Sequence, residues 1–196
     1  MGRPMVDICD GLDWARNKLP HVTLPNETIQ IDGERVVVVG WSSCGQLAMS
    51  LAWTAPERGL RPPEAILAFY CPTNYEDESQ TLPIIIGGLP SKKNSATHNI
   101  RDWNALSQPS LDEIVRVSPR AQILRGNYHT PTFLIHGTND YLIPWQQSQG
   151  TYDALRDAGV TAGLALMEGA PHICDLSSNP ESEGWKAAIQ GYEFYQ

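Results

Sequence analysis

The sequence predicts an α/β fold, in which helices cover both faces of a mostly parallel sheet. Two observations support this prediction. Short apolar runs, typical of strands buried on both faces, recur along the chain. Segments with helical spacing of apolar residues separate these runs, and such alternation is typical of parallel sheets. Because 196 residues suit one folding unit, we expect a single domain over 1–196.

The first part of the chain predicts two helices and two strands. Apolar residues at mostly helical spacing predict a helix over 6–19. A β-branched run predicts a strand over 35–40, and residues rich in Leu, Ala and Met then predict a helix over 45–54 that Pro56 stops. The segment "AILAFY" predicts a second buried strand over 65–70.

The second part of the chain begins irregularly and then resumes the alternation. Residues 73–110 are acidic at first and then broken by Pro and Gly, which favours an insertion or lid. Ser110, followed three residues later by Glu113, has the capping-box pattern of a helix over 110–117. The remaining expected elements are a strand over 130–137, a helix over 146–158, a strand over 160–169 and a helix over 185–195.

Composition and charge exclude several classes of protein. The formal net charge of −8 argues against a nucleic-acid partner, which would need a basic stripe. No window approaches the ~18–20 apolar residues of a membrane helix, and the N-terminus lacks the apolar run of a secretory signal. We therefore expect no membrane association and a cytoplasmic protein. The four cysteines form no metal-binding pattern, so we expect reduced thiols, no metal and no cofactor.

A candidate nucleophile lies between the first expected strand and the helix that follows it. Residues Gly40 to Cys44 read "GWSSC", which matches G-x-S-x-G except at its last position. In that motif a strained turn at the strand end exposes the serine hydroxyl at the N-terminus of a helix. We favour Ser42 as the nucleophile, with the backbone N–H of Ser43 in an oxyanion hole and Trp41 bordering the pocket.

Other interpretations of this turn stay open. Ser43 as nucleophile would lengthen the strand by one residue and flip its inward face. The two serines would alternatively serve only to cap the helix. Cys44 as nucleophile would lie within the helix start rather than on the turn. We also expect the Cβ of Cys44 to lie where strand and helix backbones nearly touch, in a positive-φ conformation that costs about 1 kcal/mol or more.

Two further loops supply an acid and a base in the order that nucleophilic catalysis needs. Asp140 follows the third expected strand, and His172 follows the fourth. Alone, such residues are usually solvated, capping or incidental. With Ser42, however, a histidine can accept the serine proton while a carboxylate fixes the histidine tautomer. Asp175 is the alternative carboxylate, although its short tether to His172 would direct it along its own helix. We expect His136 to pack at a strand end with a locally hydrogen-bonded ring.

Three segments together resemble a known family. They are "RVVVVGWSSCGQLAMSLAWTAPERGLRPPEAILAFYCPTNYEDE", "PTFLIHGTNDYLIPW" and "GLALMEGAPHICDL". They resemble α/β-hydrolases, in particular the C-terminal thioesterase or hydrolase region of fungal non-reducing polyketide synthases and free-standing relatives. The resemblance implies a triad of Ser42, Asp140 and His172 that forms an acyl-enzyme. It also implies a small-molecule acyl ester or a carrier-bound acyl thioester as substrate, with polyketide release as one such reaction.

The same resemblance implies that this sequence holds only part of the family fold. Strands that precede the nucleophile, and a loop that supplies an oxyanion N–H, are missing, and the lid over 73–110 is shortened. Strand 35–40 would then have an exposed edge, which favours self-association. Two other functions remain open: an inactive truncated fragment that acts as a binding module, and a serine peptidase of the prolyl-oligopeptidase kind.

Overall fold

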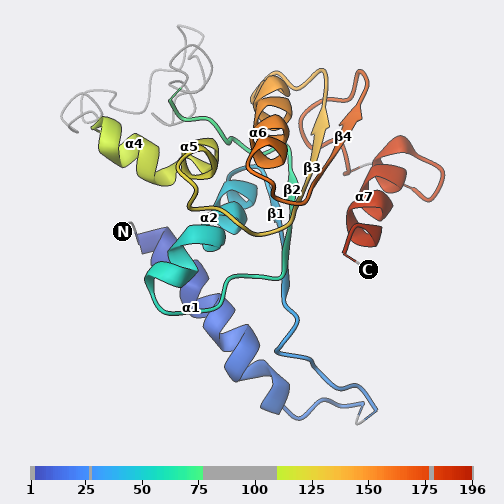
Figure 1. Ribbon diagram of the computed structural model, residues 1–196. Coiled ribbons are helices and arrows are strands. Elements are labelled where there is room, and N and C mark those ends of the chain that lie inside the picture. The colour runs from blue at the N-terminus through green and yellow to red at the C-terminus, as the bar shows by residue number, and fades with distance from the viewer. Residues whose placement is uncertain (1–2, 27, 77–109, 177–178, 196) are drawn as a thin grey trace, which may run out of the picture.

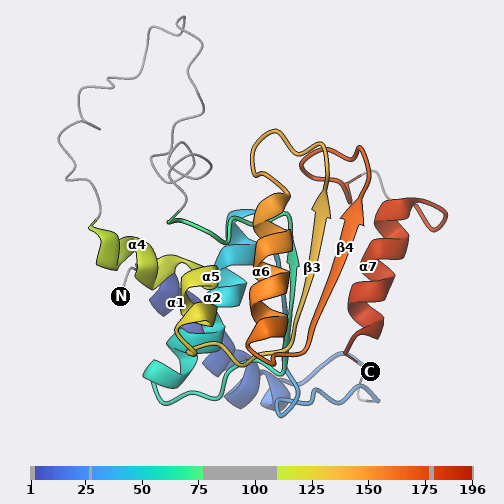
Figure 2. The ribbon, with the colours of Figure 1, turned by 45° about the horizontal axis from the view of Figure 1, so that its top comes forward.

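The computed structural model of this protein describes residues 3–26, 28–76, 110–176 and 179–195. These residues contain one sheet of four parallel strands that lie side by side in chain order. The strands are β1 (Val37–Trp41), β2 (Ala65–Phe69), β3 (Thr132–Gly137) and β4 (Ala162–Met167). Because all four run in the same direction, their carboxyl ends meet at one edge of the sheet. Figure 2 shows this for β3 and β4, whose arrowheads point the same way. The predicted α/β class is confirmed.

Helices cover both faces of the sheet, as the sequence predicts (Figures 1 and 2). One face carries α2 (Ser43–Glu57), α5 (Pro119–Leu124) and α6 (Gln146–Asp157), and α1 (Arg3–Asn17) packs on α2. The opposite face carries α7 (Glu183–Glu193). Two short helices complete the described part of the chain: α4 (Leu111–Val117), directly before α5, and the 3-10 helix η1 (Leu19–His21) after α1.

The core consists of two apolar layers, one on each face of the sheet. Along β2, Ile66 and Ala68 face the layer below α2 and α6, whereas Leu67 and Phe69 face the layer below α7. All of β2 is buried, which explains why its sequence is a continuous apolar run rather than an alternating one. A fully buried side chain of this size contributes about 1.5–3 kcal/mol. The two layers therefore hold the sheet edge in a fixed geometry.

The predicted helices are present, but most of their boundaries shift by one to three residues, as in α1 and α7. Helix α2 continues through Pro56 to Glu57. Proline lacks an N–H and so removes one hydrogen bond to the preceding turn, and the helix ends one residue later. Helix α5 was not predicted. It begins with Pro119 at its first position, where the missing N–H and the fixed φ of proline favour helix initiation. The predicted capping box is confirmed, since the Ser110 hydroxyl accepts from the Glu113 amide and the Glu113 carboxylate accepts from the Ser110 amide.

Most of the expected lid over 73–110 lies outside the described residues, because residues 77–109 are not among them. Thr73, at its start, is completely buried and packs on α6. Its hydroxyl donates to the Gln147 carbonyl at 3.0 Å and accepts from Thr151 at 2.8 Å. The chain is therefore anchored in the core where this segment begins. No helix in the described part of the chain has the length and hydrophobicity to cross a membrane.

Candidate active site

A tight turn presents Ser42 at the carboxyl edge of the sheet. Strand β1 ends at Trp41 and α2 begins at Ser43, so Ser42 alone joins them, with φ 51° and ψ −126°. A Cβ on Gly40 would lie 2.4 Å from the Cys44 carbonyl oxygen. The strand and helix therefore approach too closely for any residue but glycine at position 40. A non-glycine residue with positive φ is uncommon, and such strain clusters at functional sites.

Cys44 occupies a different place from the predicted one. Its side chain is exposed in the first turn of α2, and it is not among the positive-φ residues of the described chain. The residue that approaches its neighbours closely is Gly45, where an added Cβ would lie 2.6 Å from the Cys71 Cβ. The expectation of strain at Cys44 was therefore wrong. The motif tolerates cysteine there because Gly45, one residue later, makes the close contact.

The structure brings Ser42, His172 and Asp140 together, although they come from three separate loops. The Ser42 hydroxyl lies 3.2 Å from Nε2 of His172. Nδ1 of the same ring lies 2.7 Å from Oδ2 of Asp140. A carboxylate can only accept, so Nδ1 carries the proton and leaves Nε2 free to accept from the serine. The three side chains form one chain of hydrogen bonds from hydroxyl to carboxylate.

Asp140 lies in a buried site that keeps it ionised. Its side chain is fully buried, and its Oδ1 accepts from the amides of Leu142 and Ile143 at 2.8 and 3.0 Å. Oδ2 accepts from His172 and also from Nε2 of His136 at 3.1 Å. Burial alone would raise the pKa of Asp140. The hydrogen bonds from the two histidines and the two amides outweigh that effect and hold the pKa well below its usual range.

His136 is fully buried and bonded close to its position in the chain, as the sequence predicts. Its Nε2 also lies 3.0 Å from the Ile143 carbonyl, and its Nδ1 lies 2.7 Å from the Ser148 hydroxyl. Both partners of Nε2 are acceptors, so Nε2 carries the proton and Nδ1 accepts from Ser148. The contact with Asp140 was not foreseen.

The other predicted site residues lie around this hydrogen-bonded chain. Ser43 is the first residue of α2, where an amide has no acceptor within the helix. Trp41 is 43% exposed, and its indole N–H donates to Asp175 at 2.8 Å. Asp175 also accepts from the Tyr70 hydroxyl at 2.7 Å. The expectation that Asp175 would follow its own helix was wrong, because this segment forms a turn and the carboxylate reaches across the sheet edge.

Comparison with known proteins identifies the family. The family model described as the alpha/beta hydrolase fold matches residues 3–176. The chain belongs to the alpha/beta hydrolase family. Two fungal proteins are similar to it in sequence: 5-methylorsellinic acid synthase of Aspergillus terreus is 38% identical, and the non-reducing polyketide synthase pkbA of Emericella nidulans is 34% identical. Each match covers 97% of this chain but only 10% of the relative, so the hydrolase chain spans about a tenth of their length.

Solved structures show the same fold at lower sequence identity. Esterase 2 of Thermogutta terrifontis, solved in a form phosphonylated by sarin, matches with a TM-score of 0.63 and 20% identity. The match covers 97% of this hydrolase chain and 64% of the esterase chain. At this identity the likeness shows the shared fold alone.

A cavity of about 390 Å³ opens beside Ser42 of this hydrolase. Its lining combines the turn at Ser42 with apolar side chains from the helices around it. These side chains include Met5 of α1, Leu47 of α2 and Val117 of α4. The volume lies within the range typical of small-molecule sites. Trp41 is not part of this lining, in contrast to the prediction that it borders the pocket.

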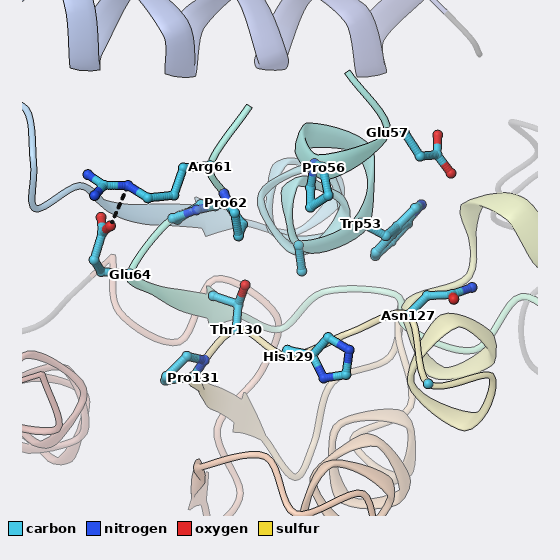
Figure 3. A pocket seen from close by; sticks show the side chains of 13 residues that line it. Trp53, Pro56, Glu57, Arg61, Pro62, Glu64, Asn127, His129, Thr130 and Pro131 are labelled. Atoms are coloured by element: carbon cyan, nitrogen blue, oxygen red, sulfur yellow. Dashed lines mark ion pairs between the residues drawn. The ribbon is translucent and has the colours of Figure 1, made fainter. Parts of the chain in front are cut away.

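A second cavity, of about 630 Å³, lies at the opposite end of the sheet of this hydrolase (Figure 3). The segments before β2 and β3 contribute Glu64 and Thr130 to it, and the C-terminal half of α2 contributes Trp53. Arg61 on its rim forms ion pairs with Glu34 and Glu64. It contains none of the predicted site residues, which gather at the carboxyl edge.

Proposed function

We propose that this alpha/beta hydrolase cleaves esters or thioesters by forming an acyl-enzyme on Ser42. The observation that carries the proposal is the continuous contact from the Ser42 hydroxyl through His172 to Asp140, at 3.2 and 2.7 Å. Both separations lie within the range expected for a nucleophile and base in the absence of substrate. In this mechanism Ser42 is the nucleophile, His172 transfers the protons and Asp140 stabilises the protonated His172.

In the first half-reaction His172 acts as general base. Ser42 Oγ attacks the carbonyl carbon of the substrate as its proton moves to Nε2 of His172. The tetrahedral intermediate then collapses, the bond to the alcohol or thiol breaks, and the leaving group takes the proton from His172. In the second half-reaction water attacks the acyl-enzyme in the same way, which releases the carboxylic acid and returns the proton to Ser42. Asp140 stays ionised and stabilises the imidazolium in both halves.

The amide of Ser43 is suited to stabilise the tetrahedral oxyanion. It lies at the N-terminus of the 15-residue helix α2, directly after the nucleophile. The helix dipole and the unpaired amides of a first turn favour negative charge there. A single hydrogen-bond donor to the oxyanion typically raises kcat by about 10²–10³-fold.

The cavity beside Ser42 favours an apolar acyl group. Polar side chains line it at Ser42, Ser43 and Gln46, Tyr75 adds an aromatic ring with a hydroxyl, and the rest of its lining is apolar. Two similar fungal proteins are, by their names, a 5-methylorsellinic acid synthase and a non-reducing polyketide synthase. This likeness supports an acyl thioester presented by a carrier as the substrate class.

Turnover assays test the proposal. We expect hydrolysis of p-nitrophenyl butyrate and of a butyryl thioester by the parent chain, and a loss of about 10⁴-fold or more in Ser42→Ala. Ser43→Ala is the matched control, because it keeps the backbone amide and should retain most of the activity. Turnover that persists in Ser42→Ala would overturn the proposal. Hydrolysis of a prolyl amide without ester turnover would favour the peptidase alternative, and no turnover of any substrate would favour the inactive fragment.

A further inference from the structure

A second carboxylate, Asp175, fastens the loop of His172 across the sheet edge. Its Oδ2 accepts from the Trp41 indole N–H at 2.8 Å, and its Oδ1 accepts from the Tyr70 hydroxyl at 2.7 Å. Trp41 directly precedes Ser42 in the chain, and Tyr70 directly follows β2. Asp175 follows His172 by three residues. The carboxylate thus ties the loop that carries the base to the strand ends beside the nucleophile.

The two donors to Asp175 are themselves held firmly. The Trp41 ring stacks on Phe69, with centroids 5.4 Å apart and planes 15° apart. Tyr70 is 3% exposed, and its ring meets that of His172 edge to face at a centroid distance of 4.6 Å. Burial, and then the hydrogen bond to Asp175, raise the pKa of the Tyr70 hydroxyl, so it remains a donor at neutral pH. The contacts of Asp175 therefore end on rigid parts of the fold.

Backbone strain marks the same cluster. Among the residues that the structure describes, the non-glycine residues with positive φ are Ser42, Tyr70 and Ile173. Ile173 lies between His172 and Asp175 and has a φ of 62°. A β-branched residue with a positive φ is a conformational outlier. Such a conformation persists only where the surroundings hold it. Ile173 is held on one side by the bond from His172 to Asp140 and on the other by the bonds of Asp175.

We propose that Trp41, Tyr70 and Asp175 are positioning residues, here called the Asp175 clamp, that hold the His172 ring over Ser42 against the strain at Ile173. The inference rests on the proposed function of Ser42 and His172, and it adds residues that act through His172 rather than on the substrate. Trp41 then contributes to the site through its indole N–H, and not by lining the acyl cavity. Asp175 supplies a fixed anchor rather than a replacement for Asp140.

Conservative substitutions distinguish the effect of losing the hydrogen bonds of the clamp from the effect of losing side-chain packing. Tyr70→Phe removes the hydroxyl but keeps the ring, and Trp41→Phe removes the indole N–H but keeps an aromatic ring on Phe69. Asp175→Ala removes both acceptors. Asp175→Asn retains one acceptor and can donate to the Tyr70 oxygen, so it should restore part of the lost function. The matched controls are Tyr192→Phe, Trp185→Phe and Asp157→Ala, at exposed positions on α7 and at the end of α6.

Kinetics give the first readout. A base displaced by about 1 Å can cost up to about 10²-fold in rate. We expect kcat for p-nitrophenyl butyrate to fall about 10-fold in Tyr70→Phe and Trp41→Phe and about 100-fold in Asp175→Ala, with KM nearly unchanged. Since the three residues act as one unit, Tyr70→Phe combined with Asp175→Ala should lose no more than Asp175→Ala alone. Losses that multiply, or that appear mainly in KM, would overturn the clamp.

A spectroscopic readout does not depend on turnover. The Nδ1–H of His172, held by Asp140, should give a slowly exchanging downfield proton resonance in the parent chain, which His172→Gln removes. We expect this resonance to broaden or vanish in Asp175→Ala, to return in Asp175→Asn, and to stay sharp in the three controls. An unchanged resonance in Asp175→Ala would overturn the clamp even if the chain proved catalytically inactive. If the resonance is lost in Asp175→Ala but the parent chain shows no esterase activity, the clamp is supported as a structural feature and only the proposed function is overturned.

Discussion

Nε2 of the buried His136 lies 3.1 Å from Oδ2 of Asp140, the same carboxylate oxygen that His172 contacts at 2.7 Å. One carboxylate oxygen therefore serves two imidazole rings, one fully buried and one at the edge of the site. The candidate catalytic aspartate is thus held by His136 on its buried side as well as by His172 on the side of the site. The ionised state and the orientation of Asp140 therefore depend in part on His136, a residue that is fully buried.

We expect His136→Leu to destabilise the fold by about 1–3 kcal/mol, because it leaves the buried Asp140, Ser148 and Ile143 groups each short of a partner. Urea unfolding at neutral pH measures this change. The control is His129→Leu, an exposed histidine on the rim of the second cavity. Equal unfolding midpoints for His136→Leu and the parent chain would contradict this description of the Asp140 site.

The depressed pKa of Asp140 predicts a specific dependence of stability on pH. Its carboxylate stabilises the fold fully above the unfolded-state pKa of about 3.9, and this contribution is lost as the pH falls from there through the lower folded-state value. Asp140→Asn should therefore be less stable than the parent at pH 7, and the difference should narrow below about pH 4. Urea midpoints across this range, with Asp157→Asn as the charge control, provide the test. A stability difference between the parent chain and Asp140→Asn that widens toward acid pH would contradict the depressed pKa of Asp140.

The cavity beside Ser42 predicts selectivity for acyl-chain length. We expect Val117→Trp to fill part of the cavity and to lower kcat/KM for a p-nitrophenyl octanoate relative to the acetate by about 10-fold or more. Val22→Trp, at an exposed position outside the cavity, controls for the larger side chain. An octanoate-to-acetate ratio that does not change in Val117→Trp would show that the acyl group binds elsewhere.

The outer edge of β1 predicts association between copies of the chain. In the described residues β1 pairs only with β2, and Val37 on this edge is 41% exposed. Val36 to Val39 also line an open apolar cavity with Leu47 and Leu51. We expect the sedimentation coefficient to rise with protein concentration, and Val37→Lys to suppress the rise more than Ile29→Lys does. A parent chain that stays monomeric at every concentration would contradict this expectation.

The sequence predicted the strands and the loops of the site because both follow from local patterns. Continuous apolar runs indicated buried parallel strands, and the carboxyl ends of such strands meet at one edge. This rule was enough to expect Ser42, Asp140 and His172 to lie near each other, since each follows a different strand. Their hydrogen-bond distances depend on side-chain directions that no periodicity encodes.

Two predictions failed because they depend on contacts that a local sequence pattern does not show. Asp175 lies 134 residues from Trp41 and 105 from Tyr70, so its spacing of three from His172 suggested a local role that it does not have. The positive φ expected at Cys44 is absent, because Gly40 and Gly45 make the close backbone contacts at this turn, whereas the strained turn expected at Ser42 is present. For Asp175, contacts across the sheet edge override the local pattern.

Covalent labelling of the nucleophile tests the central claim most directly. The parent chain is incubated with a fluorophosphonate probe, and the modified residue is mapped by peptide mass spectrometry. The geometry at Ser42 and His172 predicts one modified residue, Ser42, with no labelling in Ser42→Ala and normal labelling in Ser43→Ala and Cys44→Ala. A label on Ser43 or Cys44, or a label that persists in Ser42→Ala, would contradict the account.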